Sequence, residues 1–340
     1  MIVDGRLPWP LVLQALAVAA AVWLVIATWT LWLLVFTALT IAAAILPAAR
    51  LGERYRVPRG VTVLVVYLLV AAVLALMGRL LWPALSEQWR QFVDQLPRLV
   101  DNVKGWLGGL QVFVGRWGAT LPTAPTEGLD AVAGKVLANT FRFTAGAAGA
   151  AFEVLAVLVV AAYLVIDARD VGSALLSLLP PSVRPTAVDL APSVLNRIGG
   201  YVRGQLVSSF FVGALIAIAL TVLGVRYSLL IGAMAAVFNI VPFLGATVAA
   251  VLAVLAALNE SVTLAALTLA VMVAAQTVEG KLFAPHFVGR ATGLHPLAVL
   301  LTLLVGAHLA GLVGALVAVP FLAGLWEIVR TLWVDPRRDA

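Results

Sequence analysis

The sequence predicts an all-α polytopic membrane protein. The chain of 340 residues is 63% hydrophobic and 11% charged, whereas a soluble domain carries about 25% charged residues. Its mean hydropathy is +1.08, and several apolar runs exceed the ~18 residues that mark a transmembrane candidate. We expect six full spans plus two re-entrant helical hairpins that form an inverted repeat. The alternative is eight transmembrane helices, and amphipathic interfacial helices are expected in either case.

The N-terminal part, 1–82, is predicted to hold the first three transmembrane helices and to act as a scaffold. Only Ala27, Thr28 and Trp29 separate the first two apolar runs, so we expect a tight helical pair. The third span is expected to end at Trp82-Pro83. The loop between the second and the third expected spans, 49–60, is rich in Arg, which is typical of a cytoplasmic loop. The expected spans are 9–27, 29–48 and 61–82.

Residues 83–145 are predicted to be an extracytoplasmic amphipathic insert. Charges of both signs return here, and apolar residues recur at steps of three and four, which indicates one amphipathic helix face. Such helices lie at the membrane interface or pack on neighbours. The apolar residues of this face are Trp89, Phe92, Leu96, Leu99 and Val103. The next part, 146–203, should hold the fourth transmembrane helix followed by cytoplasmic amphipathic helices.

The last part, 204–333, is predicted to be a transport core with two broken segments, 228–258 and 296–326. The first segment has 31 residues without a charge. As one helix it would be about 46 Å long, against a hydrocarbon core of ~30 Å. Asn239 and Pro242 interrupt it near its centre, and "GAHLAGLVGA" interrupts the second segment. Full helices at 204–224 and 262–279 precede the two segments.

Each broken segment is either a kinked span or a hairpin. The loop after Glu279 carries Lys281 and Arg290 without an acid, and the hairpin topology places it in the cytoplasm, so the basic-loop rule favours hairpins. Hairpins would also make the core an inverted repeat, which many secondary transporters use. "GATVA" (245–249) echoes "GALVA" (314–318). Both topologies place both termini in the cytoplasm.

Polar groups at membrane depth are tolerated when they are buried in protein or line a watery cavity. Pro242 should free the carbonyl of Phe238 from a helical bond, and Glu279 is the candidate for ion coupling. The alternatives are a kink whose Asn239 bonds a neighbouring helix, and an interfacial Glu279 paired with Lys281 or Arg290. The predicted substrate-binding residues are Asn239, Pro242, Phe243, Gly245, Gln276, His308, Gly311 and Gly314.

The sequence argues against several other chemistries. Without Cys there is no disulfide, thiolate nucleophile or Cys-ligated metal, and His286 and His295 have no acidic cluster beside them. Residues 128–136 lack the spacing of a phosphate loop. No nucleophile–base pair occurs in the membrane runs. We therefore expect a protein that is not an enzyme and holds no cofactor or metal. Nucleic-acid binding is not expected, because the Arg residues are spread over loops.

Four segments carry a family resemblance. They are "YVRGQL" (201–206), "NIVPFLG" (239–245), "VEGKLFAPHFVGRATGLHPLAVLLTLLVG" (278–306) and "GLVGALVAVPF" (311–321). In residues, order and spacing they resemble the autoinducer-2 exporter family of bacterial membrane proteins. The likeness extends over nearly the whole chain, although 1–82 and 83–145 resemble the family in pattern only. Phe243 stands where the family often has Tyr, which removes one hydroxyl from the expected site.

The resemblance implies a multi-pass transporter of the bacterial plasma membrane. It implies a homo-oligomer, with the pentamer as one candidate, and export of a small polar signalling molecule such as autoinducer-2 by an elevator-like motion. Members have also been assigned Na⁺(Li⁺)/H⁺ antiport, which is the second hypothesis here, with Glu279 as the exchanging carboxylate. A third hypothesis is a non-transporting membrane scaffold that docks partners through 83–145. The expected partners are the lipid bilayer and a small-molecule or ion substrate.

Overall fold

The computed structural model describes residues 9–117, 134, 149, 151–283 and 294–335. Within these ranges the chain is helical and has no strand, so the predicted all-α class is confirmed. Five helices are long and apolar enough to cross a membrane, and a sixth candidate is a bent pair, Ala151–Ile166 with α5 (Ala168–Ser177). The five are Trp29–Arg54, Arg59–Gly115, Arg184–Val222, Val262–Phe283 and Pro296–Val334.

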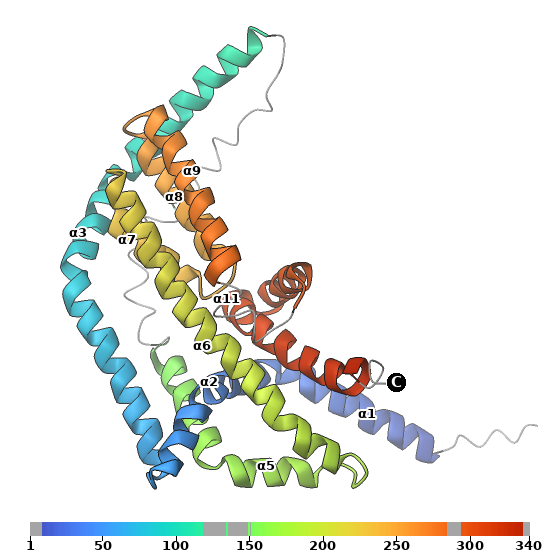
Figure 1. The fold of residues 1–340 in the computed structure, drawn as a ribbon. Helices are drawn as coiled ribbons and strands as arrows, with labels where there is room; N and C mark the ends of the chain where they lie inside the picture. Colours follow the sequence, from blue (N-terminus) through green and yellow to red (C-terminus); the bar gives the residue numbers. More distant parts are fainter. Residues whose placement is uncertain (1–8, 118–133, 135–148, 150, 284–293, 336–340) are drawn as a thin grey trace, which may run out of the picture.

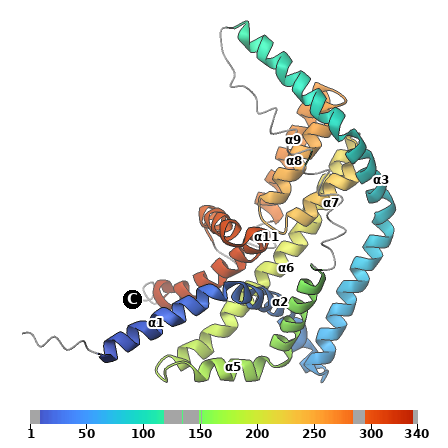
Figure 2. The ribbon, with the colours of Figure 1, turned by 180° about the vertical axis from the view of Figure 1, so that it is seen from behind.

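The first two helices differ from the expected tight pair. Helix α1 (Trp9–Ala27) and helix α2 (Trp29–Arg54) are joined at Thr28, whose hydroxyl donates to the Leu24 carbonyl at 2.6 Å. Figures 1 and 2 show α1 running on from the end of α2 and away from the other helices. One linking residue is too short to reverse the chain, because helical hairpins need loops of about two to five residues.

A group of small and branched side chains joins α2, the start of α3 and the helix Ala151–Ile166, and we call it the N-terminal cluster. The hydroxyl of Tyr67 on α3 donates to the Leu158 carbonyl at 2.8 Å across this contact. The cluster therefore fixes the start of α3 in the first part of the chain. Its buried members are Ala38, Ala42, Ile45, Ala49, Val63, Ala161 and Val165.

Helix α3 (Arg59–Gly115) is continuous through Pro83 and Pro97, so the helix that contains the expected third span continues beyond Trp82-Pro83. Pro83 is exposed, and packing beyond it holds the helix together. On the later half Phe92 and Leu99 are buried, which is the amphipathic face read from the sequence. This half packs against α7 and α8. Tertiary packing of an apolar face stabilises a helix more than local propensity does.

The predicted boundary between 203 and 204 falls inside a continuous helix. After an 81° bend at Asp167 and the short α5, the chain forms α6 (Arg184–Val222), a single helix of 39 residues. This one helix contains both the last of the expected cytoplasmic amphipathic helices, before 203, and the expected full helix at 204–224. The first half of α6 packs on α2, where the Arg203 Nη1 donates to the Ala44 carbonyl at 2.9 Å. The expected start of the fourth helix, at 146, lies outside the described residues.

The first broken segment is a helical hairpin. Helix α7 (Ser228–Phe238) and helix α8 (Leu244–Leu258) pack on each other. Arg226 precedes α7 and Glu260 follows α8, yet the Arg226 Nε and the Glu260 Oε1 lie 2.6 Å apart. The two outer ends of the segment therefore meet, which a single kinked helix does not allow.

This hairpin packs with α6 and with α9 (Val262–Val278), as Figure 1 shows. On α6 and α7, Gly213 and Gly232 face each other so closely that a Cβ on either would overlap the other's carbonyl oxygen. Small residues allow such close approach of helices in membranes. We call this packed group the core cluster. Its buried members include Val212, Ile216, Leu220, Ile231, Ala235, Ala249, Ala253, Met272 and, from α3, Phe92 and Leu99.

The second broken segment, α11 (Pro296–Val329), reverses direction at Ala310 and Gly311, whose backbone angles are not helical. A Cβ on Gly314 would overlap the Gly306 carbonyl oxygen. In a continuous helix eight residues would separate these positions by about 12 Å. The two arms of α11 therefore lie side by side. A short π-helical turn, η2 (Arg330–Val334), follows.

Candidate functional site

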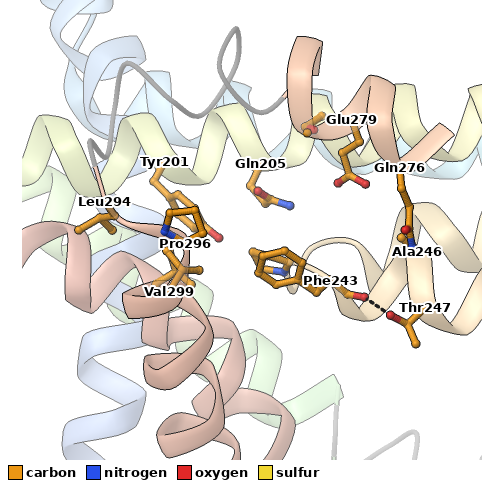
Figure 3. A pocket seen from close by; sticks show the side chains of 14 residues that line it. Tyr201, Gln205, Phe243, Ala246, Thr247, Gln276, Glu279, Leu294, Pro296 and Val299 are labelled. Atoms are coloured by element: carbon orange, nitrogen blue, oxygen red, sulfur yellow. Dashed lines mark hydrogen bonds between the residues drawn. The ribbon is translucent and has the colours of Figure 1, made fainter. Parts of the chain in front are cut away.

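The candidate site is a cavity of about 470 Å³ where α6, the α7–α8 break, the end of α9 and the start of α11 meet. Figure 3 shows the Gln205, Glu279, Gln276 and Phe243 side chains converging on it. The cavity joins elements that are far apart in the sequence. Its lining residues are Tyr201, Gln205, Ser208, Pro242, Phe243, Ala246, Thr247, Gln276, Glu279, Gly280, Leu294, Pro296, Val299 and Val319.

The α7–α8 break forms one wall of the cavity. Phe243 has a φ of 68°, in the left-handed region that a bulky residue rarely adopts. Its side chain is 54% exposed, and the Thr247 hydroxyl donates to its carbonyl at 2.7 Å. Strain of this kind persists where the surrounding structure enforces it, and it is common at ligand sites.

Gly245 allows the hairpin to close behind the cavity. A Cβ on Gly245 would overlap the backbone nitrogen of Asn239 and the carbonyl oxygen of Ala235. Pro242 has no N–H with which to make the helical bond to the Phe238 carbonyl, as expected, but that carbonyl is not left free, because it accepts from the Val241 N–H at 3.1 Å. The turn itself supplies the partner that the proline cannot.

Asn239 connects three helices around the cavity. Its side chain is 0% exposed, and its Nδ2 donates to the Glu279 Oε1 at 2.8 Å. The Gln205 Nε2 on α6 donates to the Asn239 carbonyl at 2.5 Å. Within the part of the chain that the structure describes, the Asn239 Oδ1 has no hydrogen-bond partner. A fully buried oxygen of this kind is an acceptor available to a water, a cation or a ligand.

Glu279 caps the end of α9 and faces the cavity. Lys281 forms no salt bridge with it among the described residues, and Arg290 lies outside them. The Glu279 carboxylate therefore belongs to the site through its bond with Asn239. Buried polar groups at this depth are costly unless they are paired, and unpaired capacity indicates a functional site.

The structure brings together part of the predicted site. Pro242, Phe243, Gln276 and Glu279 line the cavity, while Asn239 and Gly245 support it from behind. The remaining predicted residues, His308, Gly311 and Gly314, lie at the α11 break and are not among the lining residues. His308 is exposed.

Sequence reasoning left Tyr201, Gln205 and Ser208 out of the predicted site. All are on α6, and all are buried at 6% exposure or less. The sequence pattern that could have identified them is the recurrence of polar residues every three or four positions along an apolar helix. Among the described residues, no group of His, Asp and Glu could hold a metal ion.

Comparisons with known proteins agree with the sequence resemblance. The sequence model of the family described as "AI-2E family transporter" matches residues 11–333. "Putative transport protein YrrI" of Bacillus subtilis is 28% identical over 320 residues, which cover 89% of this chain and 86% of the relative. "Putative transport protein MT0215" of Mycobacterium tuberculosis is 28% identical and covers 95% and 89%. "Putative transport protein YhhT" of Escherichia coli K12 is 25% identical and covers 82% and 76%.

Proposed function

Because the chain belongs to the AI-2E transporter family, we propose that it exports a small polar signalling molecule of the autoinducer-2 type through the cavity at the α7–α8 break. It would act as a secondary transporter in the bacterial plasma membrane, with both termini in the cytoplasm. The observation that carries the proposal is the bonded set of Gln205, Asn239 and Glu279 beside a cavity of about 470 Å³.

The chemistry of the cavity supports a small polar substrate. Ligand sites are concave and mostly apolar, with a few polar groups that fix orientation. Here Phe243, Val299 and Leu294 supply apolar surface, and Gln276 and Glu279 supply polar groups. In the proposed mechanism the core cluster moves as an elevator relative to the N-terminal cluster. The assembly would be a homo-oligomer such as a pentamer.

Two hairpins support the proposed inverted repeat. Gly245 follows the left-handed Phe243, and Gly314 follows the left-handed Gly311. Each of these glycines lets the two arms of its hairpin approach closely. They are also equivalent positions in the "GATVA" and "GALVA" echo. Inverted-topology repeats with broken helices are common in secondary transporters.

Export is tested with everted membrane vesicles that accumulate autoinducer-2. Asn239→Ala should reduce accumulation at least about tenfold, because Glu279 loses its partner and the break loses its anchor. The matched control is Thr277→Val, since among the described residues the Thr277 hydroxyl bonds the Val273 carbonyl of its own helix and no other group. Accumulation that persists in a correctly assembled Asn239→Ala protein would sink the proposed site.

The membrane placement of the hairpins is tested by labelling. The chain has no Cys, so one Cys at Lys281 reports a single position. Re-entrant hairpins place it in the cytoplasm, where an impermeant maleimide added outside intact cells does not reach it. Labelling from outside would favour eight transmembrane helices instead.

The second candidate is cation/proton antiport, favoured by the unpartnered Asn239 Oδ1 beside the Glu279 carboxylate. Oxygen atoms of this kind are ligands for hard cations. In everted vesicles, adding Na⁺ or Li⁺ should then dissipate a preformed proton gradient, as reported by a pH-sensitive dye. Antiport that survives Glu279→Gln would exclude this mechanism.

A further inference from the structure

We propose that the cavity selects its ligand by charge, accepting small neutral or positively charged polar molecules and rejecting anions of the same size. This inference rests on the proposed function, because it concerns the ligand of the same cavity. The observation behind it is the composition of the wall. Among the described lining residues Glu279 is the one acidic side chain, and none is Lys, Arg or His.

Among the described residues, the basic side chains nearest to the wall in the sequence are not part of it. His295 stands between Leu294 and Pro296, but it is exposed and its Nδ1 accepts from the Leu297 N–H at 3.2 Å. Arg203 lies two positions before Gln205, but its guanidinium donates to the Ala44 carbonyl of α2 at 2.9 Å. Lys281 lies two positions after Glu279, yet it is exposed and is not among the lining residues. An anion in the cavity therefore meets no cationic side chain from the described wall.

The polar groups of the wall are one carboxylate and several neutral hydroxyls and amides. Glu279 only accepts hydrogen bonds when it is ionised, whereas the neutral side chains of Tyr201, Gln205, Ser208 and Gln276 can both donate and accept. One amide N–H of Gln205 already donates to the Asn239 carbonyl. The carboxylate therefore decides the preference for charge, and the neutral groups can bind hydroxyl groups of a ligand.

Electrostatics makes this preference strong in a partly enclosed site. At an effective dielectric constant of ~20, a unit charge about 5 Å from a carboxylate changes the local concentration of an ion on the order of a hundredfold. Phe243, whose ring projects into the cavity in Figure 3, adds an aromatic face that attracts cations. Polyols and small amines fit this chemistry, and phosphorylated or carboxylated metabolites do not.

The test uses the absence of Cys in the chain. Val299→Cys places one thiol in the cavity wall, and Thr247→Cys is the second position if the first variant does not fold. Each is treated with two methanethiosulfonates of similar size, one carrying trimethylammonium and the other sulfonate. In each reaction the thiolate attacks the reagent sulfur, an S–S bond forms and methanesulfinate leaves. Rates are divided by those of the same reagents with free 2-mercaptoethanol.

We expect the cationic reagent to react about tenfold faster than the anionic one. In the Glu279→Gln background the ratio should fall towards one. Glu87→Gln removes an exposed carboxylate of α3 that is not in the wall, and it should leave the ratio unchanged. Equal rates, faster reaction of the anion, or a cation preference that survives Glu279→Gln would each overturn the proposal.

Autoinducer-2 transport by the labelled protein separates this inference from the proposed function. Blocked transport is expected once the cavity carries the reagent. If the rates show the charge preference while labelled protein still transports, charge selection stands and the proposed transport route fails. If transport is blocked while both reagents react equally, the route stands and charge selection fails.

Discussion

The guanidinium of Arg226 and the carboxylate of Glu260 form an ion pair of 2.6 Å that closes the outer end of the α7–α8 hairpin. At the opposite end, Asn239 bonds both Glu279 and Gln205. The hairpin is therefore held at its outer end by a surface pair and at its inner end by a buried polar set. The two ends should respond very differently to substitution.

The outer pair should contribute little to stability. Both side chains are partly exposed, so Arg226→Gln should lower the free energy of unfolding by no more than about 1 kcal/mol. A double-mutant cycle with Glu260→Gln, followed by denaturant unfolding of the purified protein, measures the coupling. A coupling energy several times larger would mean that the pair is shielded in the membrane-embedded protein.

The inner end should be more sensitive. Gln205→Leu removes the donor to the Asn239 carbonyl, which is left buried without that bond. The free energy of unfolding should fall by about 1–3 kcal/mol. Thr277→Val is the matched control, since it removes a hydroxyl bonded within its own helix. Equal stability of the two variants would contradict the role given to Gln205.

Gly245→Ala should open the hairpin. Its Cβ would overlap the backbone of Asn239 and Ala235, and overpacking of this kind costs about 1–3 kcal/mol. Both thermal stability and transport should fall, because the clash lies directly behind the cavity. Gly108→Ala has open space around its Cβ and should be neutral or stabilising. Similar melting temperatures for both variants would refute the close packing.

Gly311→Ala tests the backbone conformation of the second break without adding a steric clash. Gly311 has a φ of 58°, and no atom lies within 4 Å of an added Cβ. With its ψ of −140°, this backbone conformation is open essentially to glycine alone, so it should cost the alanine about 1–3 kcal/mol. The helical Gly78→Ala, which also has free space, should not be destabilised. Unfolding curves of both proteins provide the comparison, and an unaffected Gly311→Ala would mean that the break adopts another conformation.

The helical class and the first break could be predicted because they depend on local signals. A long uncharged run interrupted by Asn239 and Pro242 indicates a break in the helix whatever the rest of the fold does, and the structure shows that this break is a reversal. The end of α3 could not be predicted in the same way. Proline at position 83 is a local stop signal, but burial of Phe92 and Leu99 against distant helices overrides it.

The candidate site was likewise predictable where it depends on local signals and not where it depends on packing between distant helices. Gln276 and Glu279 were predicted because each is a polar residue in or beside an apolar run, and Phe243 because it lies at the expected break. His308 was predicted for the same reason, yet it is exposed at the second break. The distance of His308 from the cavity depends on how α11 packs. The residues that α11 contributes to the wall are Pro296, Val299 and Val319, and the residues of its break are not among them. Periodicity along one helix does not contain that information.

The continuity of α3 and α6 has a mechanical consequence. Each helix contacts the N-terminal part of the chain near its start and the core cluster further along, and the residues of α3 from 68 to 80 are all exposed. The N-terminal cluster and the core cluster are therefore joined by two continuous helices. Any displacement of one cluster relative to the other must tilt or bend both helices together. Pro83 and Pro192 lie within these helices, where a missing backbone donor makes bending easiest.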